Sequence, residues 1–304
     1  RLSVDAGYMR ADGNYPFTLV NGKYVTKEKR NNSEVESWQG EATLYHTFKD
    51  DGELDVKGYY YYSARELPGG VTLYNPISDE KLWDENFFTQ ARYKKKFSTK
   101  WTLQAQAKYN HSWNRYRDEG VEYTDGFYRE VHRQDEYYLS ATLLYQPLED
   151  LTFSLAQDGV ANTLRNSLPA CPFPIRYTSI SALNGRYRTD WMTATASLVY
   201  TATSEHVEQG DKPDNFHRLV PSVTFNIRPW QDESLFVRLM YKSTFRLPTF
   251  NDLYYLRMGN RDLRPEKANE YNVGVTWSRS KWGIFGFLSM TVDGYFNDVT
   301  DKIV

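Results

Sequence analysis

The chain has 304 residues, with 37 basic and 39 acidic side chains and a formal net charge of −2 at pH 7. This near balance gives no reason to expect a nucleic-acid partner. Apolar residues make up 40% of the chain. They never run for the roughly 18 positions that a membrane-spanning helix needs, so the sequence excludes such helices.

Alternation of apolar and polar residues starts at Leu2 and recurs along the whole chain. The clearest example is 101–110, where Trp101, Leu103 and every second residue after them are apolar and the residues between are polar. A side-chain period of two indicates a β-strand with one face on an apolar surface. The pattern predicts about 13 strands, near 2–9, 41–48, 54–62, 87–94, 101–110, 136–145, 151–155, 176–188, 191–203, 219–228, 235–245, 266–277 and 284–292.

The expected connections alternate between short and long. Outer-membrane barrels have this arrangement, with short periplasmic turns and long external loops, and their tilted strands need roughly 9–11 residues. We therefore expect an all-β, antiparallel transmembrane β-barrel. Short turns are predicted at 49–53, 97–100, 147–150, 229–233 and 280–282, and long loops at 12–34, 64–81, 113–128, 160–175, 205–215 and 246–265. The lipid-facing residues should include Leu103, Ala105, Leu139, Leu143, Val237, Leu239, Leu288 and Met290.

Aromatic residues make up 16% of the chain, with 25 tyrosines and 8 tryptophans. Membrane barrels place such side chains at both membrane interfaces, where an apolar ring and a polar tip both find partners. A tyrosine-rich, soluble β-sheet binding protein would share this composition and is the alternative from another class. It gives no reason, however, for the strict alternation of loop length.

The most distinctive stretch joins two alternating strands through a long, turn-rich segment. It reads Arg246-x-Pro248-x-Phe250-x-Asp252-Leu253-Tyr254, then Gly259-Asn260-x-Asp262-Leu263-x-Pro265-Glu266. Proline cannot donate to a β-ladder, so Pro248 and Pro265 should end the flanking strands. Read in order, these residues closely resemble a signature in the barrel of TonB-dependent outer-membrane receptors, and 298–304 resembles the end of the family's next strand. We expect the signature to be structural, ordering a long external loop.

That resemblance implies a 22-stranded barrel with an N-terminal plug in its lumen. It also implies energised uptake of a scarce ligand, driven by the TonB complex through a box ahead of the plug. Residues 1–304 would then be a partial barrel domain, from which the plug domain and the terminal strands are absent. The chain opens on a strand without a signal peptide. We therefore expect an internal piece of a longer mature protein, surrounded by outer-membrane lipid in a Gram-negative cell.

A looser resemblance covers only about 60–90. Arg65-Glu66-Leu67-Pro68-Gly69-Gly70 follows a tyrosine-rich strand, and Leu82-Trp83-Asp84-x-Asn86-Phe87-Phe88 comes soon after. These segments resemble Bacteroidetes receptors often labelled as vitamin B12 receptors, which implies cobalamin as the ligand. Uptake of a ferric siderophore or of haem is the close alternative. The expected ligand is therefore a small-molecule metal chelate, and a surface lipoprotein is a further candidate partner.

External loops of a receptor must capture its ligand, so binding groups are expected at the external ends of the strands. The loops at 64–81 and 113–128 combine aromatic rings, which stack on flat ring systems, with arginines, which pair with carboxylates or phosphates. The alternative is that these loops are ordered by their own aromatic residues or pack against lipopolysaccharide. The candidate ligand-binding residues are Arg65, Tyr74, Trp113, Arg115, Tyr116 and Tyr123.

The sequence nominates no catalytic centre. Patterns of serine hydrolases, dinucleotide-binding folds and P-loops do not occur. The five histidines, at 46, 111, 132, 206 and 217, are scattered without metal-ligand spacing, and the single Cys171 cannot form an internal disulfide. We therefore expect no enzyme activity, no resident metal and no cofactor; an outer-membrane barrel hydrolase is kept as an alternative.

Overall fold

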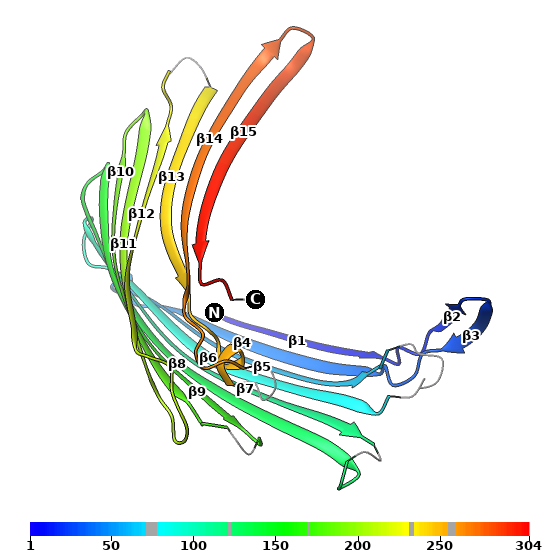
Figure 1. The fold of residues 1–304 in the computed structure, drawn as a ribbon. Coiled ribbons are helices and arrows are strands. Elements are labelled where there is room, and N and C mark those ends of the chain that lie inside the picture. Colours follow the sequence, from blue (N-terminus) through cyan, green and yellow to red (C-terminus); the bar gives the residue numbers. More distant parts are fainter. Residues whose placement is uncertain (71–77, 121–122, 169–170, 231–233, 255–258, 304) are drawn as a thin grey trace.

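The structure is a computed structural model and describes residues 1–70, 78–120, 123–168, 171–230, 234–254 and 259–303. Thirteen strands form one antiparallel sheet in which neighbours in space are neighbours in the chain, except that β1 pairs with β4. A separate hairpin, β2–β3, lies between those two strands in the sequence. Figure 1 shows the sheet as one curved wall with β1 and β15 at its two free edges.

The strands are long, which is what crossing a bilayer at a tilt requires. In the main sheet they range from 10 residues in β1 to 22 in β8. The main strands are β1 (Leu2–Ala11), β4 (Val35–Thr47), β5 (Glu53–Leu67), β6 (Glu80–Lys96), β7 (Trp101–Glu119), β8 (Phe127–Leu148), β9 (Leu151–Asn166), β10 (Ile175–Arg188), β11 (Met192–His206), β12 (Phe216–Ile227), β13 (Ser234–Arg246), β14 (Glu266–Trp282) and β15 (Phe285–Thr300). The hairpin is β2 (Pro16–Asn21) with β3 (Tyr24–Lys29), and the helix α1 is Phe250–Tyr254.

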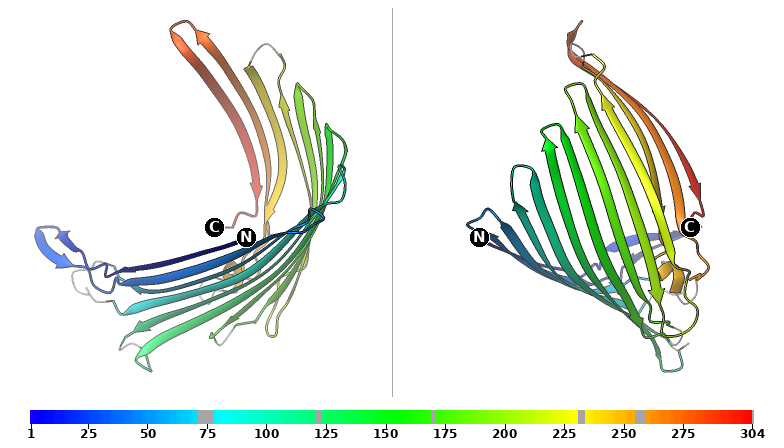
Figure 2. Two further views of the ribbon diagram at one scale, coloured as in Figure 1. Left: turned by 180° about the vertical axis from the view of Figure 1, so that it is seen from behind. Right: turned by 90° about the vertical axis from the view of Figure 1, so that its left-hand side faces the viewer.

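The predicted all-β class, the antiparallel order and the alternation of loop length are confirmed. The connections β4–β5, β6–β7, β8–β9, β10–β11, β12–β13 and β14–β15 are short, and those at the other strand ends are long. Figure 2 shows tight hairpins at one end of the wall. We call the end with the long connections the external end.

Several strand ends differ from the prediction, because apolar alternation stops before the ladder does. β5 continues to Leu67 and β7 to Glu119, so the predicted loops 64–81 and 113–128 are shorter than expected. Aromatic and charged side chains are compatible with a strand whose two faces both meet water. The residues that consequently lie on strands and not in loops are Arg65, Trp113, Arg115 and Tyr116.

The connection after β1, predicted as a long loop, contains a hairpin. β2 and β3 pair as a hairpin with Asn21 opposite Tyr24. The two-residue loop is therefore Gly22-Lys23, and Gly22 has a φ of 59°, the positive φ that glycine supplies at the first loop position of a type II′ hairpin turn. The helix α1 was also not predicted. Within the described ranges no helix is long and apolar enough to cross a membrane.

The register gives the wall two distinct faces, because residues directly opposite in a ladder project from the same side. Leu103 is opposite Leu143, and this side continues pair by pair across the sheet to β15. The eight residues predicted to face lipid all lie on this side, which we call the outer face. The intervening polar residues, such as Gln104, lie on the opposite side, which we call the lumen face.

Aromatic pairs bound the apolar band of the outer face at both ends. Trp101 stacks on Tyr145 near the short turns, with ring centroids 4.2 Å apart. Tyr109 and Tyr137 pair toward the external end at 5.0 Å. Eight residues separate these levels on a strand, or about 27 Å before tilt, comparable with the apolar band of about 25 Å in outer-membrane barrels. The pattern matches the aromatic belts that such barrels place at the two membrane interfaces.

Opposite faces of one strand should respond differently to the same charge. We predict that Ala141→Arg, at mid-height on the outer face of β8, destabilises the protein in lipid by about 2–4 kcal/mol. Thr142→Arg, one residue away on the lumen face, should cost much less because the lumen is polar. Urea titration of the intact protein folded into lipid vesicles measures both. Equal costs would contradict the assignment of faces.

Candidate functional site

The structure divides the predicted ligand-binding residues between the two faces of the wall. Arg65 of β5 and Tyr116 of β7 lie on the lumen face, each directly opposite Leu82 of β6. Trp113 and Arg115 lie on the outer face, because side chains alternate along β7.

Of the two remaining predicted residues, the structure describes only Tyr123. Tyr123 belongs to the connection between β7 and β8 and contacts residues of both strands. Tyr74 lies outside the described residues. The structure therefore groups Tyr116 and Tyr123 at the external end of the lumen face, with Arg65 two strands away.

Three tyrosines and several acidic groups gather there, and we call this group the rim cluster. The Tyr128 ring lies 6.2 Å from that of Tyr116 and 5.9 Å from that of Tyr123, measured between centroids. The Tyr123 hydroxyl donates to Asp118 at 2.6 Å, and the Tyr128 hydroxyl donates to Glu130 at 2.9 Å. The rim cluster consists of Glu80, Tyr116, Asp118, Tyr123, Tyr128, Glu130 and His132.

Tyr116 is held in its neutral, donating form. Burial raises the pKa of its hydroxyl, and a hydrogen bond to Glu80 raises this pKa further. Both causes act in the same direction, because each disfavours the phenolate. The rim cluster therefore presents fixed aromatic surfaces beside carboxylates, a combination that can hold a flat ligand and orient its polar groups.

Sequence reasoning missed the polar half of this cluster. His132 Nε2 lies 2.5 Å from Glu130 Oε1, and both follow Tyr128 at a spacing of two. The available signal was this spacing, which places all three on one face once β8 is known to begin at Phe127. Further along the lumen face Arg65 pairs with Asp84, while Arg65 Nε is buried and meets no partner in the described part of the chain.

Trp113 and Arg115 instead form part of the outer surface. The Arg115 guanidinium lies 3.9 Å from the centroid of the Trp83 ring and 5.7 Å from that of Trp113. Such stacking is a cation–π contact. It orders the outer side of the wall and directs both predicted side chains away from the lumen.

The signature segment begins with a capped helix. Thr249 precedes α1, its amide donates to the Asp252 carboxylate at 2.8 Å, and the Asp252 amide donates to the Thr249 hydroxyl at 3.2 Å. This reciprocal pair is a capping box. The amide of Thr249 is the largest cause lowering the pKa of Asp252, and Arg246 also favours the carboxylate. The strands flanking the segment end at Arg246 and begin at Glu266, which are directly opposite each other.

A buried ion pair joins the helix to the lumen face. Arg176 of β10 donates through Nε to Glu205 of β11 at 2.8 Å and through Nη1 to the Pro248 carbonyl at 2.8 Å. The Tyr254 hydroxyl donates to the other Glu205 oxygen. Burial and this hydrogen bond raise the pKa of Tyr254. Beside the ion pair, Phe250, Leu253 and Tyr254 pack on Leu164 of β9.

A cavity of about 620 Å³ lies between the signature segment, the β11–β12 connection and the wall. Its size is within the range of ligand pockets in proteins. Its charged lining residues are Arg176, Glu205, Lys212, Asp214, Arg261, Asp262 and Arg264. Across the described ranges, no three histidine, cysteine or acidic side chains come together as metal ligands.

The hydrogen bond of Tyr254 should stabilise the signature segment. We predict that Tyr254→Phe lowers the free energy of unfolding by about 1–3 kcal/mol, because a buried carboxylate oxygen of Glu205 loses its donor. Glu205 is 6% exposed and Tyr254 is 8% exposed. Thermal unfolding of the intact protein, with hydrogen exchange of 247–265, measures the effect. Tyr295→Phe, at a tyrosine that is 78% exposed, is the control, and an equal shift in it would contradict the assigned role.

Comparison with known families gives one match over the whole chain. The family described as "TonB dependent receptor-like, beta-barrel" matches residues 1–304. A search of curated proteins found no match.

Solved structures share the fold at low sequence identity. They include the FrpB iron transporter of Neisseria meningitidis, F3-3 variant, with a TM-score of 0.73 and 14% identity over 99% of this chain and 51% of that chain. A double mutant of the Serratia marcescens hemophore receptor HasR, in complex with its hemophore HasA and heme, has a TM-score of 0.66. It is 14% identical over 90% of this chain and 47% of that chain. BauA, the ferric preacinetobactin receptor of Acinetobacter baumannii, has a TM-score of 0.64 and 10% identity over 97% of this chain and 54% of that chain. The chain thus spans about half the length of these proteins.

Proposed function

Because the chain belongs to the TonB-dependent receptor-like β-barrel family, we propose that it forms part of the wall of an outer-membrane receptor for energised uptake of a small metal chelate. In this proposal the outer face meets lipid and the lumen face meets the ligand. The TonB complex would act through an N-terminal part that is not in this sequence. A surface lipoprotein is a further proposed partner. We propose a receptor and not an enzyme.

The rim cluster is the observation that carries the proposed ligand site. It lies at the external strand ends, where an incoming ligand arrives first, and on the lumen face, along which the ligand must pass. Its tyrosine rings can stack on a flat chelate, and Arg65 nearby has a buried N–H without a partner among the described residues. Of the residues predicted from sequence, we propose Arg65, Tyr116 and Tyr123 as ligand contacts. We do not propose Trp113 and Arg115 as ligand contacts, because both side chains lie on the outer face and point away from the lumen.

Two resemblances bear on the choice among chelates. The resemblance of 60–90 to receptors labelled for vitamin B12 supports cobalamin. The similar structures are an iron transporter, a receptor in complex with its hemophore and heme, and a ferric preacinetobactin receptor, which favours the alternative of a ferric siderophore or haem. All these ligands combine a metal with an extended organic frame, and the rim cluster suits that shared chemistry.

Two neighbouring aromatic positions of β7 provide the test. We predict that Tyr116→Ala weakens chelate binding about 10-fold or more, since one stacking or charge-assisted contact contributes roughly 1–3 kcal/mol. Trp113→Ala should leave binding unchanged, because its ring lies on the outer face. Binding of cyanocobalamin, haemin and a ferric siderophore to the intact receptor in detergent is measured by tryptophan fluorescence and calorimetry.

The comparison between the two variants decides the site. Tyr116→Phe keeps the ring and loses the hydroxyl, so it should retain most of the affinity if stacking dominates. A loss of chelate affinity in Trp113→Ala alone would show that the ligand site is not on the lumen face. Binding of none of the three chelates by the folded, wild-type receptor would contradict the proposed ligand class.

A further inference from the structure

We propose that the outer face of the wall, beyond the aromatic belt at the external end, binds the phosphate headgroups of an anionic lipid. This inference rests on the proposed function, because it takes the wall to stand in an outer membrane. The site consists of Arg129 and Arg133 of β8, Arg165 of β9 and Ser167 just after β9. We call these four residues the arginine patch.

The register places the patch on the lipid side of the wall and beyond the lipid band. Arg133 is directly opposite Arg165, and both share the outer face with Tyr137 and Leu139. Arg133 lies four residues past Tyr137 toward the external end, or about 13 Å along the strand. Polar headgroups lie just beyond the aromatic belt of such barrels. The patch is therefore at the height of the headgroups and not of the acyl chains.

The ladder places arginines directly opposite each other here. Arg117 is directly opposite Arg129, and Arg133 is directly opposite Arg165. Like charges opposite each other destabilise a sheet. On the lumen face, by contrast, Asp55 is directly opposite Arg92, and the two form an ion pair at 3.1 Å. A bound anion would turn the repulsion within the patch into attraction.

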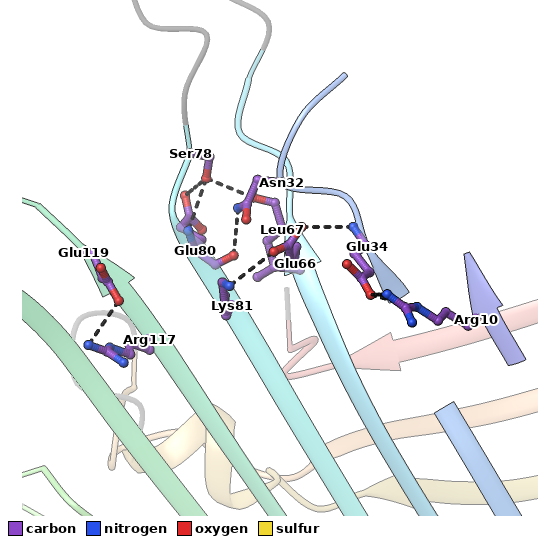
Figure 3. Close-up of polar contacts among 10 residues, drawn as sticks. All are labelled: Arg10, Asn32, Glu34, Glu66, Leu67, Ser78, Glu80, Lys81, Arg117 and Glu119. Atoms are coloured by element: carbon purple, nitrogen blue, oxygen red, sulfur yellow. Dashed lines mark hydrogen bonds and ion pairs between the residues drawn. The ribbon is translucent and has the colours of Figure 1, made fainter. Parts of the chain in front are cut away.

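Two cations beside the patch, Lys81 and Arg117, already have acidic partners. Figure 3 shows these ion pairs, Lys81 with Glu66 at 3.1 Å and Arg117 with Glu119 at 3.0 Å. Within the patch, Arg165 pairs with Glu208 at 3.0 Å. Arg129 and Arg133 are exposed and have no acidic partner in the described part of the structure.

The patch also has the shape and the donors that a phosphate needs. It forms a groove of about 260 Å³, whose lining includes Val131 and Asn166 with the four patch residues. The Ser167 hydroxyl accepts a hydrogen bond from the Val131 amide at 3.0 Å, which leaves its own proton free to donate. Guanidinium groups donate in a planar fork that matches phosphate oxygens. The groove therefore offers donors from Arg129, Arg133 and Ser167 to a single anionic group, with Arg165, whose Nη2 already donates to Glu208, beside them.

The test measures binding of a defined lipid to the intact receptor in a non-ionic detergent. The probe is the lipid A disaccharide carrying two phosphates, followed by native mass spectrometry. Arg129→Gln/Arg133→Gln is expected to weaken binding about 10-fold or more, because charge-assisted hydrogen bonds are lost. The corresponding double substitution to lysine should restore part of the affinity, since lysine keeps the charge and loses the fork.

Three controls make the result decisive. Arg279→Gln removes an exposed, outward-facing arginine near the short-turn end of β14 and should change nothing. Dephosphorylated lipid A should bind weakly to every variant. Equal binding of dephosphorylated lipid A by the wild type, or an equal loss in Arg279→Gln, would overturn the site. If inorganic phosphate at low millimolar concentration displaces lipid A, the patch binds a free phosphate ion, and the proposal of a lipid ligand is overturned. If the lipid binds as expected and no chelate does, the proposed ligand fails while this site stands.

Discussion

The hydrogen-bonded ladder is the constraint on which the rest of the structure depends. In lipid, an unpaired backbone amide or carbonyl is too costly, so each strand between the two edges must be paired on both sides. Fixing the pairing also fixes the register, and a slip of one residue would move every apolar side chain to the wrong face. The alignment of Leu103 with Leu143 and its continuation across the sheet thus decides what meets lipid and what meets the lumen.

The lumen face solves the opposite problem, since its polar side chains need partners of their own. The ion pair of Arg176 with Glu205 provides them and also binds the signature segment through Pro248 and Tyr254. Apolar packing of α1 on Leu164 accompanies this ion pair. The segment therefore folds against the wall and forms one side of a cavity, while the rim cluster occupies the external end of β6–β8.

Much of the fold could be predicted from the sequence, because the two faces meet such different surroundings. The period of two identifies each strand, and Leu103 and Gln104 could be assigned to opposite faces from alternation alone. The prediction failed where that contrast ends. Beyond the aromatic belt both faces carry polar residues, so the external ends of β5 and β7 were predicted as loops. The hairpin β2–β3 and the partners of Tyr116 were missed for the same reason, since the apolar signal is absent and the cross-strand register has no sequence signature.

The central claim is that alternate residues of one strand meet lipid and water. Single spin labels at each position from 137 to 145 of β8, in a Cys171→Ser background of the intact receptor in lipid vesicles, test it directly. Collision rates with oxygen dissolved in the lipid should be high at the odd positions, and collision rates with a water-soluble nickel chelate should be high at the even positions. A scan without a period of two, or with the two collision patterns exchanged, would contradict the account.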